Sequence, residues 1–129
     1  MNSLVILAGG LGERAKQKDP KQFLILNSSK NVRLMYLQYP YLNQQSHNFE
    51  EIIVVVPKKW QTIISKEIKQ MCSISKVISG GENRTESSYL GLKACSSKCK
   101  KVLIHDAARP FASKKLYTTC IKYLDKYDA

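Results

Sequence analysis

A short apolar run that ends in a glycine-rich turn is the feature that most constrains this fold, and the chain contains it twice. Leu4–Ala8 leads into Gly9-Gly10-Leu11-Gly12. Val77-Ile78 is followed closely by Gly80-Gly81. Such runs are typical of buried strands, and glycine lets the chain turn sharply at positive φ angles. Two strands that each end in a glycine turn, followed by helical segments, are consistent with strands that alternate with helices.

Two further apolar runs complete the predicted sheet. Glu51–Val56 is almost entirely aliphatic and is followed by Pro57, which is typical of a strand covered on both faces. We therefore expect this strand at the centre of a parallel sheet. Lys101–His105 is the fourth predicted strand, and it is followed by Asp106 and Arg109.

Apolar residues at helical spacing predict four helices. The first spans Asn31–Leu42 and the second spans residues 59 to 72. The third begins after the second glycine turn, where Asn83 and Glu86 have the spacing of a capping box. The fourth is capped by Ser113 and is expected to run to the last residue. The residues expected to face the core are Leu34, Leu37, Tyr41, Trp60, Ile63, Ile64, Ile68, Met71, Gly91, Leu92, Cys95, Leu116, Tyr117, Cys120, Ile121, Leu124 and Tyr127.

Strands that alternate with helices predict a Rossmann-like, three-layer α/β fold with a mainly parallel sheet, and 129 residues suit a single domain. In such folds, ligands bind at the carboxyl ends of the strands. Three polar motifs follow predicted strands: the first glycine loop, Gly80-Gly81, and Asp106 with Arg109. We expect these motifs to converge on one edge of the sheet.

The first glycine loop is suited to binding phosphate. Its backbone N–H groups can face an anion, and Arg14 and Lys21 add two cations beside it. Gly10–Ala15 also fits the dinucleotide fingerprint, but Pro20 lies too close for a crossover helix, and no strand ending in Asp or Glu follows about 20 residues on. No Walker motif is present. The alternative is a tight turn with solvated cations.

The charge balance favours a polyanionic partner. Twenty-one Lys and Arg residues against 10 Asp and Glu residues give a formal net charge of +11. The basic residues are dispersed and have no aromatic interleaving, so a nucleic-acid-binding module is the weaker alternative, and nucleotides or sugar phosphates are the expected partners. No apolar run is long enough to span a membrane, and no signal peptide is recognisable, which favours a cytoplasmic protein.

The four cysteines are expected to be reduced rather than bridged. Cys95 and Cys99 are four residues apart and could share a helix face. Cys72 and Cys120 are each isolated, so no second pair with zinc-ligand spacing exists. His47 and His105 are interpreted as a surface residue and a supporting residue rather than as metal ligands.

Together, these motifs resemble those of the 2-C-methyl-D-erythritol 4-phosphate cytidylyltransferase family, which also contains ribitol-5-phosphate enzymes. The matching segments, in this order, are Leu7–Arg14, Pro20–Leu24, Gly80–Arg84 with Ser87, Gly91-Leu92, and His105–Pro110. They cover nearly the whole chain. Pro57–Trp60 looks more like the ribitol-phosphate branch, whereas His105–Phe111 looks more like the methylerythritol branch, so the acceptor stays open.

The resemblance implies a nucleotidyltransferase that joins CTP to a polyol phosphate and releases pyrophosphate. The favoured acceptor is 2-C-methyl-D-erythritol 4-phosphate, an isoprenoid precursor, and the alternative is ribitol 5-phosphate. The implied catalytic residues are Arg14 and Lys21, which neutralise charge on the α-phosphate. Asp106 is the implied ligand of the cofactor Mg²⁺. The implied nucleotide-binding residues are Ala8, Gly9, Gly10, Gly12, Gly81, Glu82, Ser87, Ala107 and Arg109.

Members of this family are homodimers and continue beyond the last predicted helix. Their further segment supplies acceptor-binding residues, a second metal-binding aspartate and a dimerisation arm. This chain therefore resembles a truncated, nucleotide-binding front part, and we expect it to be inactive by itself. The resemblance implies a cytoplasmic enzyme, or one of the plastid stroma in a eukaryote.

Overall fold

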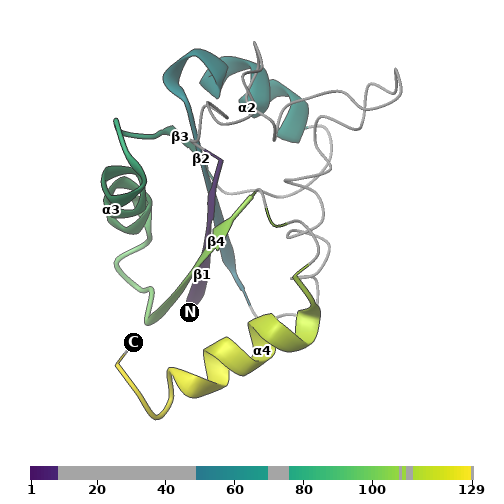
Figure 1. Cartoon of the computed structure of the whole chain (residues 1–129), viewed down its shortest axis with the longest axis vertical. Coiled ribbons are helices and arrows are strands. Elements are labelled where there is room, and N and C mark those ends of the chain that lie inside the picture. The colour runs from purple at the N-terminus through teal and green to yellow at the C-terminus, as the bar shows by residue number, and fades with distance from the viewer. Residues whose placement is uncertain (9–48, 70–75, 108, 110–111, 129) are drawn as a thin grey trace.

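The structure is a computed structural model that describes residues 1–8, 49–69, 76–107, 109 and 112–128 (Figure 1). The predicted helix Asn31–Leu42 lies outside these residues. The described elements, in chain order, are β1 (Asn2–Leu7), β2 (Glu51–Val56), the 3-10 helix η4 (Lys58–Trp60), α2 (Gln61–Lys69), β3 (Lys76–Ser79), α3 (Arg84–Ala94), β4 (Lys101–Asp106) and α4 (Lys114–Tyr123).

The four strands form one parallel sheet in the order β3-β2-β1-β4. The prediction that Glu51–Val56 is a central strand is confirmed, since β2 lies between β3 and β1. Strand β4 is one residue longer than expected. Asp106 is consequently its last residue and pairs with Leu7 at the end of β1.

Alternate residues of the central strands face opposite layers, as the period of two in a strand requires. On one face, the strands pack against Trp60 and Ile64 after β2 and against Tyr117 and Ile121 of α4. On the other face, they pack against Ala94 and Cys95 at the end of α3. Figure 1 shows α3 on one side of the sheet, with α2 and α4 on the other. The predicted three-layer α/β fold is confirmed.

Helix α3 lies very close to the sheet at Gly91. A Cβ atom at this position would lie 2.5 Å from Val5 Cγ1 and 3.3 Å from Val55 Cγ2. Only glycine therefore fits without displacing the sheet or the helix. The expected close approach of this helix to the sheet is confirmed.

Several residues expected to face the core are exposed instead. They are Ile63, Leu92, Leu116 and Tyr127, with exposed fractions of 42%, 44%, 51% and 59%. The first three each adjoin a buried residue of the same helix, and successive helical residues point about 100° apart, so both cannot face the sheet. Tyr127 lies beyond α4, which ends at Tyr123 rather than at the last residue. Within the described residues, no helix is both long and apolar enough to cross a membrane.

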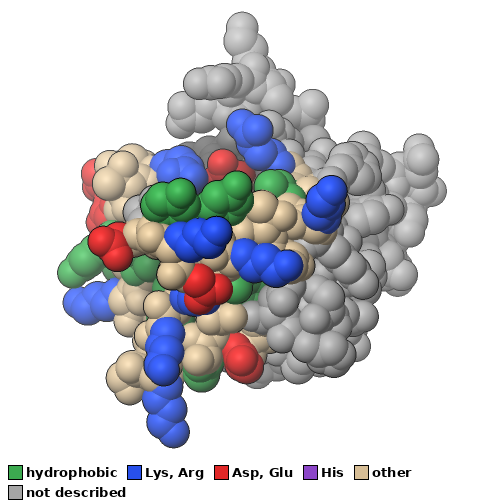
Figure 2. Space-filling model, turned by 90° about the horizontal axis from the view of Figure 1, so that it is seen from below, with side chains coloured by type: hydrophobic (Ala, Val, Ile, Leu, Met, Phe, Trp, Pro, Cys, Tyr) green, Lys and Arg blue, Asp and Glu red, His purple; other side chains and the backbone are tan. Residues whose placement is uncertain are grey.

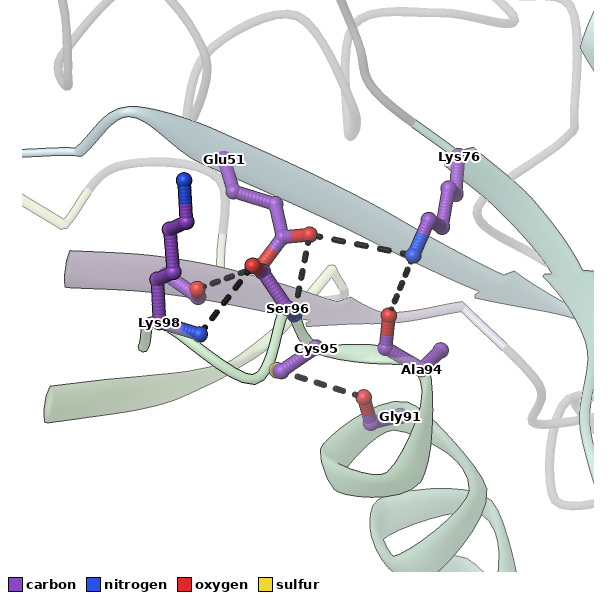
Figure 3. A network of polar contacts seen from close by, with 8 residues as sticks. Glu51, Lys76, Gly91, Ala94, Cys95, Ser96 and Lys98 are labelled. Carbon is purple, nitrogen blue, oxygen red and sulfur yellow. Dashed lines mark hydrogen bonds and ion pairs between the residues drawn. The ribbon is translucent and has the colours of Figure 1, made fainter. Parts of the chain in front are cut away.

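A buried carboxylate ties the amino ends of the strands together. Glu51, at the start of β2, is 4% exposed and accepts a hydrogen bond of 2.6 Å from the Ser3 hydroxyl in β1. It also accepts from the backbone N–H of Ser96, after α3, at 3.1 Å (Figure 3). Lys76, at the start of β3, lies 3.8 Å from Glu51 and donates to the Ala94 carbonyl at 2.6 Å.

Candidate functional site

The strand order reverses between β1 and β4, and the carboxyl ends of these two strands are therefore the expected place for a ligand. The chain winds from β1 through β2 to β3 and then returns to the far side of β1 for β4. Open α/β sheets bind ligands where the strand order reverses, beyond the carboxyl ends of the strands. Leu7 and Asp106 lie opposite each other at this point. The first glycine loop follows directly in the chain.

Ala8 and Ala107 continue the hydrogen-bonding pattern one residue beyond the strands. The N–H of Ala8 donates to the Val55 carbonyl at 2.7 Å, and the N–H of Ala107 donates to the Leu7 carbonyl at 2.9 Å. Both side chains are buried in the core. Any contact of these two residues with a ligand would therefore involve their backbone atoms.

The second glycine turn is held by Ser87, which is 5% exposed. The N–H of Gly81 donates to the Ser87 hydroxyl at 3.1 Å. A Cβ atom at Gly80 would lie only 2.7 Å from that hydroxyl and 3.1 Å from Val55 Cγ1. Glycine is needed at position 80 because the turn lies directly against the helix and the sheet.

The start of α3 forms a cap that differs from a standard capping box in one hydrogen bond. The Asn83 side chain accepts from the N–H of Glu86 at 2.8 Å, as the capping-box spacing predicts. The Glu86 carboxylate accepts at 2.9 Å from Glu82, one residue before the cap, rather than from Asn83. The N–H groups of Gly81 and Glu82 are thus already bonded to side chains of this helix. These two N–H groups can therefore bind an anion only if their present hydrogen bonds break.

An ion pair joins the second glycine turn to the end of β4. Arg84 is the first residue of α3, and its Nε donates to Asp106 Oδ1 at 3.2 Å. The two side chains are 66% and 36% exposed. In the sequence, Arg84 belongs to a segment that matches the family, and no role was predicted for it. Its position right after the helix cap was a usable signal, because side chains at a helix start lean toward the preceding turn.

The segment after Asp106 forms a tight turn. The N–H of Arg109 donates to the Asp106 carbonyl at 3.0 Å, and His105 Nε2 lies 2.9 Å from the Arg109 carbonyl. Since a carbonyl only accepts, Nε2 must carry the proton. Burial lowers the pKa of His105 below its ordinary value, so the ring is neutral near pH 7. The ring also packs edge-on against Tyr117, with centroids 5.5 Å apart.

The donor set suits a metal ion that arrives with a phosphate ligand. Asp106 offers one half-exposed carboxylate at the edge of the sheet. In the described part of the chain, no group of three or more His, Cys, Asp or Glu residues is arranged to hold a metal. Mg²⁺ is commonly bound by one or two carboxylates together with phosphate oxygens and water. The residues present fit that mode of binding.

Five predicted site residues lie outside the described residues: Gly9, Gly10, Gly12, Arg14 and Lys21. The other predicted site residues are described, and two motifs that are distant in sequence meet through Arg84 and Asp106. On the face that Figure 2 shows, basic side chains of the described residues are interspersed with acidic and apolar ones.

Comparison with known proteins identifies similar sequences over the whole chain. The sequence profile of the 2-C-methyl-D-erythritol 4-phosphate cytidylyltransferase family matches residues 3–129. The protein of that name from Clostridium botulinum (strain Loch Maree / Type A3) is 38% identical over 131 residues, which cover 99% of this chain and 55% of that protein. The chain thus spans about half the length of the curated relatives it matches.

Solved structures resemble the described fold. The 4-diphosphocytidyl-2C-methyl-D-erythritol synthase from Anaerococcus prevotii has a TM-score of 0.73 and 29% identity, and the match covers 98% of this chain and 52% of that one. A Mycobacterium tuberculosis protein, solved as a complex with manganese, has a TM-score of 0.63 and 13% identity, over 94% of this chain and 58% of that one. At that identity, the second likeness concerns the fold alone.

Proposed function

We propose, since this chain belongs to the 2-C-methyl-D-erythritol 4-phosphate cytidylyltransferase family, that it forms the nucleotide-binding part of a cytidylyltransferase. The proposed substrates are CTP and 2-C-methyl-D-erythritol 4-phosphate. The products are 4-diphosphocytidyl-2-C-methyl-D-erythritol and pyrophosphate. The reaction is a step toward isoprenoid precursors.

The observation that carries this proposal is the convergence of separate motifs at the carboxyl edge of the sheet. Asp106 lies opposite Leu7, and the first glycine loop begins two residues beyond Leu7. Arg84 reaches Asp106 from the second glycine turn at 3.2 Å. A cation such as Arg84 at this edge of the sheet favours a phosphate ligand. The relatives at 36–38% identity carry the proposed activity in their names.

The proposed chemistry needs positioning and charge stabilisation rather than a covalent nucleophile. An oxygen of the acceptor phosphate attacks the α-phosphorus of CTP, the bond from that phosphorus to the bridging oxygen breaks, and pyrophosphate leaves. We propose that Arg14 and Lys21 stabilise the negative charge that develops around the α-phosphorus. We assign the backbone of Ala8 and Gly81 to positioning the nucleotide.

Further nucleotide contacts are assigned on the same basis. Gly9, Gly10 and Gly12 are proposed to wrap the triphosphate in the first glycine loop. Glu82 is proposed to contact the nucleoside through its backbone. Ser87 is proposed to act by holding the second glycine turn in shape, because its hydroxyl is bonded to Gly81. Ala107 and Arg109 are proposed to line the same site beside Asp106.

We propose Mg²⁺ as the cofactor and Asp106 as its protein ligand in this part of the chain. When bound, the ion would supply positive charge to the triphosphate. The half-exposed carboxylate and the expected phosphate oxygens are ligands that Mg²⁺ prefers.

The proposal is tested by pyrophosphate release with each of the four nucleoside triphosphates and each acceptor. The protein for this test should include the further length that the relatives have. We expect turnover with CTP, Mg²⁺ and 2-C-methyl-D-erythritol 4-phosphate. Turnover with UTP or GTP but not with CTP would contradict the family activity. A preference for ribitol 5-phosphate would contradict the proposed acceptor alone.

A further inference from the structure

The contact between Arg84 and Asp106 uses only part of what each side chain offers. The guanidinium donates through Nε, at 3.2 Å from Asp106 Oδ1. Its two terminal nitrogens carry four more N–H groups, and these make no hydrogen bond or ion pair with any other described residue. Asp106 Oδ2 likewise has no such partner among the residues the structure describes. The pair is held by a single hydrogen bond.

Such a pair is easily broken. The strongest arginine–carboxylate pairs are bidentate, with two parallel hydrogen bonds through the guanidinium fork. Exposed single contacts contribute little net stability, because water solvates both partners after separation. The Arg84 side chain is 66% exposed and that of Asp106 is 36% exposed. Both groups can therefore change partners at small cost.

The position of the pair indicates which partners those are. Asp106 is the last residue of β4 and lies beside the end of β1, at the point where the strand order reverses. Arg84 is the first residue of α3, so its guanidinium lies at the positive end of the helix dipole, where an anion is favoured. A triphosphate with a divalent cation offers an anion for the guanidinium and a cation for the carboxylate.

We propose that Arg84 is a partner-exchanging residue of the nucleotide site. Without nucleotide, Arg84 neutralises Asp106 and keeps the carboxylate from binding divalent cations alone. With the metal–nucleotide complex, Asp106 releases Arg84, and the guanidinium binds phosphate oxygens of the nucleotide. The protein then takes up metal and triphosphate together. This inference rests on the proposed function and adds a residue and a binding order to it.

The test compares Arg84→Gln with Lys93→Gln in this 129-residue chain. Lys93 is an exposed residue of the same helix, so its substitution removes the same charge away from Asp106. Mn²⁺ binding without nucleotide is measured by electron paramagnetic resonance, and CTP binding in the presence of Mg²⁺ is measured by calorimetry. For R84Q we expect Mn²⁺ to bind about two- to fivefold more tightly, and CTP about tenfold more weakly. K93Q should match the wild type in both.

The proposal predicts that R84Q binds Mn²⁺ more tightly but CTP more weakly, and a purely structural role of Arg84 would not produce these opposite changes. If Arg84 only held α3 to β4, R84Q would weaken both ligands and lower the melting temperature, which would overturn the proposal. Unchanged Mn²⁺ and CTP affinities would also overturn it. The double variant R84Q/D106N should lose the gain in Mn²⁺ affinity, and retention of that gain would place the metal elsewhere and refute the exchange.

Failure of the inference can be told apart from failure of the proposed function. The Mn²⁺ measurement involves no nucleotide, so a missing gain in R84Q counts against the exchange whatever the enzyme's substrate is. Wild-type protein that binds Mn²⁺ but shows no preference for CTP over other nucleoside triphosphates counts against the proposed function. In that case, a retained gain in R84Q would still support exchange of Asp106 between Arg84 and a cation.

Discussion

The two ends of the sheet each present a carboxylate, and the two carboxylates differ in how completely the protein binds them. Glu51, at the amino ends of the strands, is 4% exposed and contacts Ser3. It also contacts Ser96 and Lys76, as Figure 3 shows. Asp106, at the carboxyl ends, is half-exposed and has Arg84 as its side-chain partner among the described residues. A carboxylate that is already fully bound serves the fold, whereas one that is partly bound and exposed can bind a ligand.

The difference follows from what surrounds each group. A buried charge is tolerated only when hydrogen bonds and an opposite charge replace the lost water. Glu51 meets this requirement through groups from two other strands and from the segment after α3, so it joins parts of the chain that are distant in sequence. Asp106 is partly solvated and needs no such compensation. Substitution of Glu51 should therefore lower mainly the stability of the fold, whereas substitution of Asp106 should affect mainly ligand binding and activity.

The largest expected effect is on stability at the amino end. Glu51→Ala removes the acceptor for the Ser3 hydroxyl and the Ser96 N–H, and it leaves Lys76 without its charge partner. We expect the free energy of unfolding to fall by about 3 kcal/mol, measured by urea denaturation. Glu50→Ala is the matched control, because this neighbouring carboxylate is exposed. A loss below about 1 kcal/mol in E51A would remove the basis of the comparison.

The next effect concerns Asp106 and should appear in function rather than in stability. Asp106→Asn keeps the size of the side chain but removes its charge. We expect cytidylyl transfer, in a protein with the further length of the relatives, to slow by about 100-fold or more. The free energy of unfolding should change by less than about 1 kcal/mol, because the pair with Arg84 is exposed.

Asp125→Asn is the control for Asp106→Asn. Asp125 is also an exposed carboxylate, and it pairs with Lys101 near the amino ends of the strands. Its substitution should leave the transfer rate unchanged. If D106N were as active as the wild type, or D125N as slow as D106N, the distinction between the two ends of the sheet would fail.

A smaller effect is expected at Ser87, where structure and binding overlap. Ser87→Ala leaves the N–H of Gly81 without its acceptor in a partly buried turn. We expect a loss of about 1 kcal/mol in the free energy of unfolding, together with weaker CTP binding, since the turn would no longer be fixed. Ser88→Ala is the control, because that hydroxyl bonds back to the Arg84 carbonyl within the helix. Equal effects of S87A and S88A would speak against a special role of the turn.

The sequence predicted those features that depend on local patterns. The apolar runs gave β1 and β2, and the spacing of Asn83 and Glu86 gave the start of α3. Local patterns could not predict the order of the strands, because after β3 the chain returns across the sheet and β4 pairs with the far side of β1. The contact of Arg84 with Asp106 depends on that crossing, so a position after the helix cap could place Arg84 near the turn but could not identify Asp106 as its partner.

The buried role of Glu51 was hidden for a similar reason. A glutamate at the start of an apolar strand usually lies at the surface, and its three partners come from positions that the sequence does not connect. Exposed apolar residues such as Leu92 and Leu116 were misplaced, because helical spacing permits neighbouring faces and only packing selects one. Local sequence patterns thus predict helices and strands well, whereas contacts between distant segments can be identified only once the fold is known.

The smallest expected effect is a pH dependence of stability at the carboxyl end, and it originates from His105. Burial lowers the pKa of this imidazole in the folded protein, and the positive charge of Arg109 acts in the same direction, whereas Asp106 and the bond to the Arg109 carbonyl oppose the shift. The unfolded chain therefore binds a proton at a higher pH than the folded protein does. The contribution of His105 to stability is fully present above the ordinary histidine pKa of about 6.5 and is lost as the pH falls through it toward the lower folded value. Urea denaturation at pH values from about 7.5 to 5 should show the wild type losing stability relative to His105→Gln, which has no imidazole to protonate. If the wild type instead gained stability relative to this variant on acidification, His105 would be charged in the folded protein, and the turn that holds Asp106 would depend on an ion pair rather than on a neutral ring.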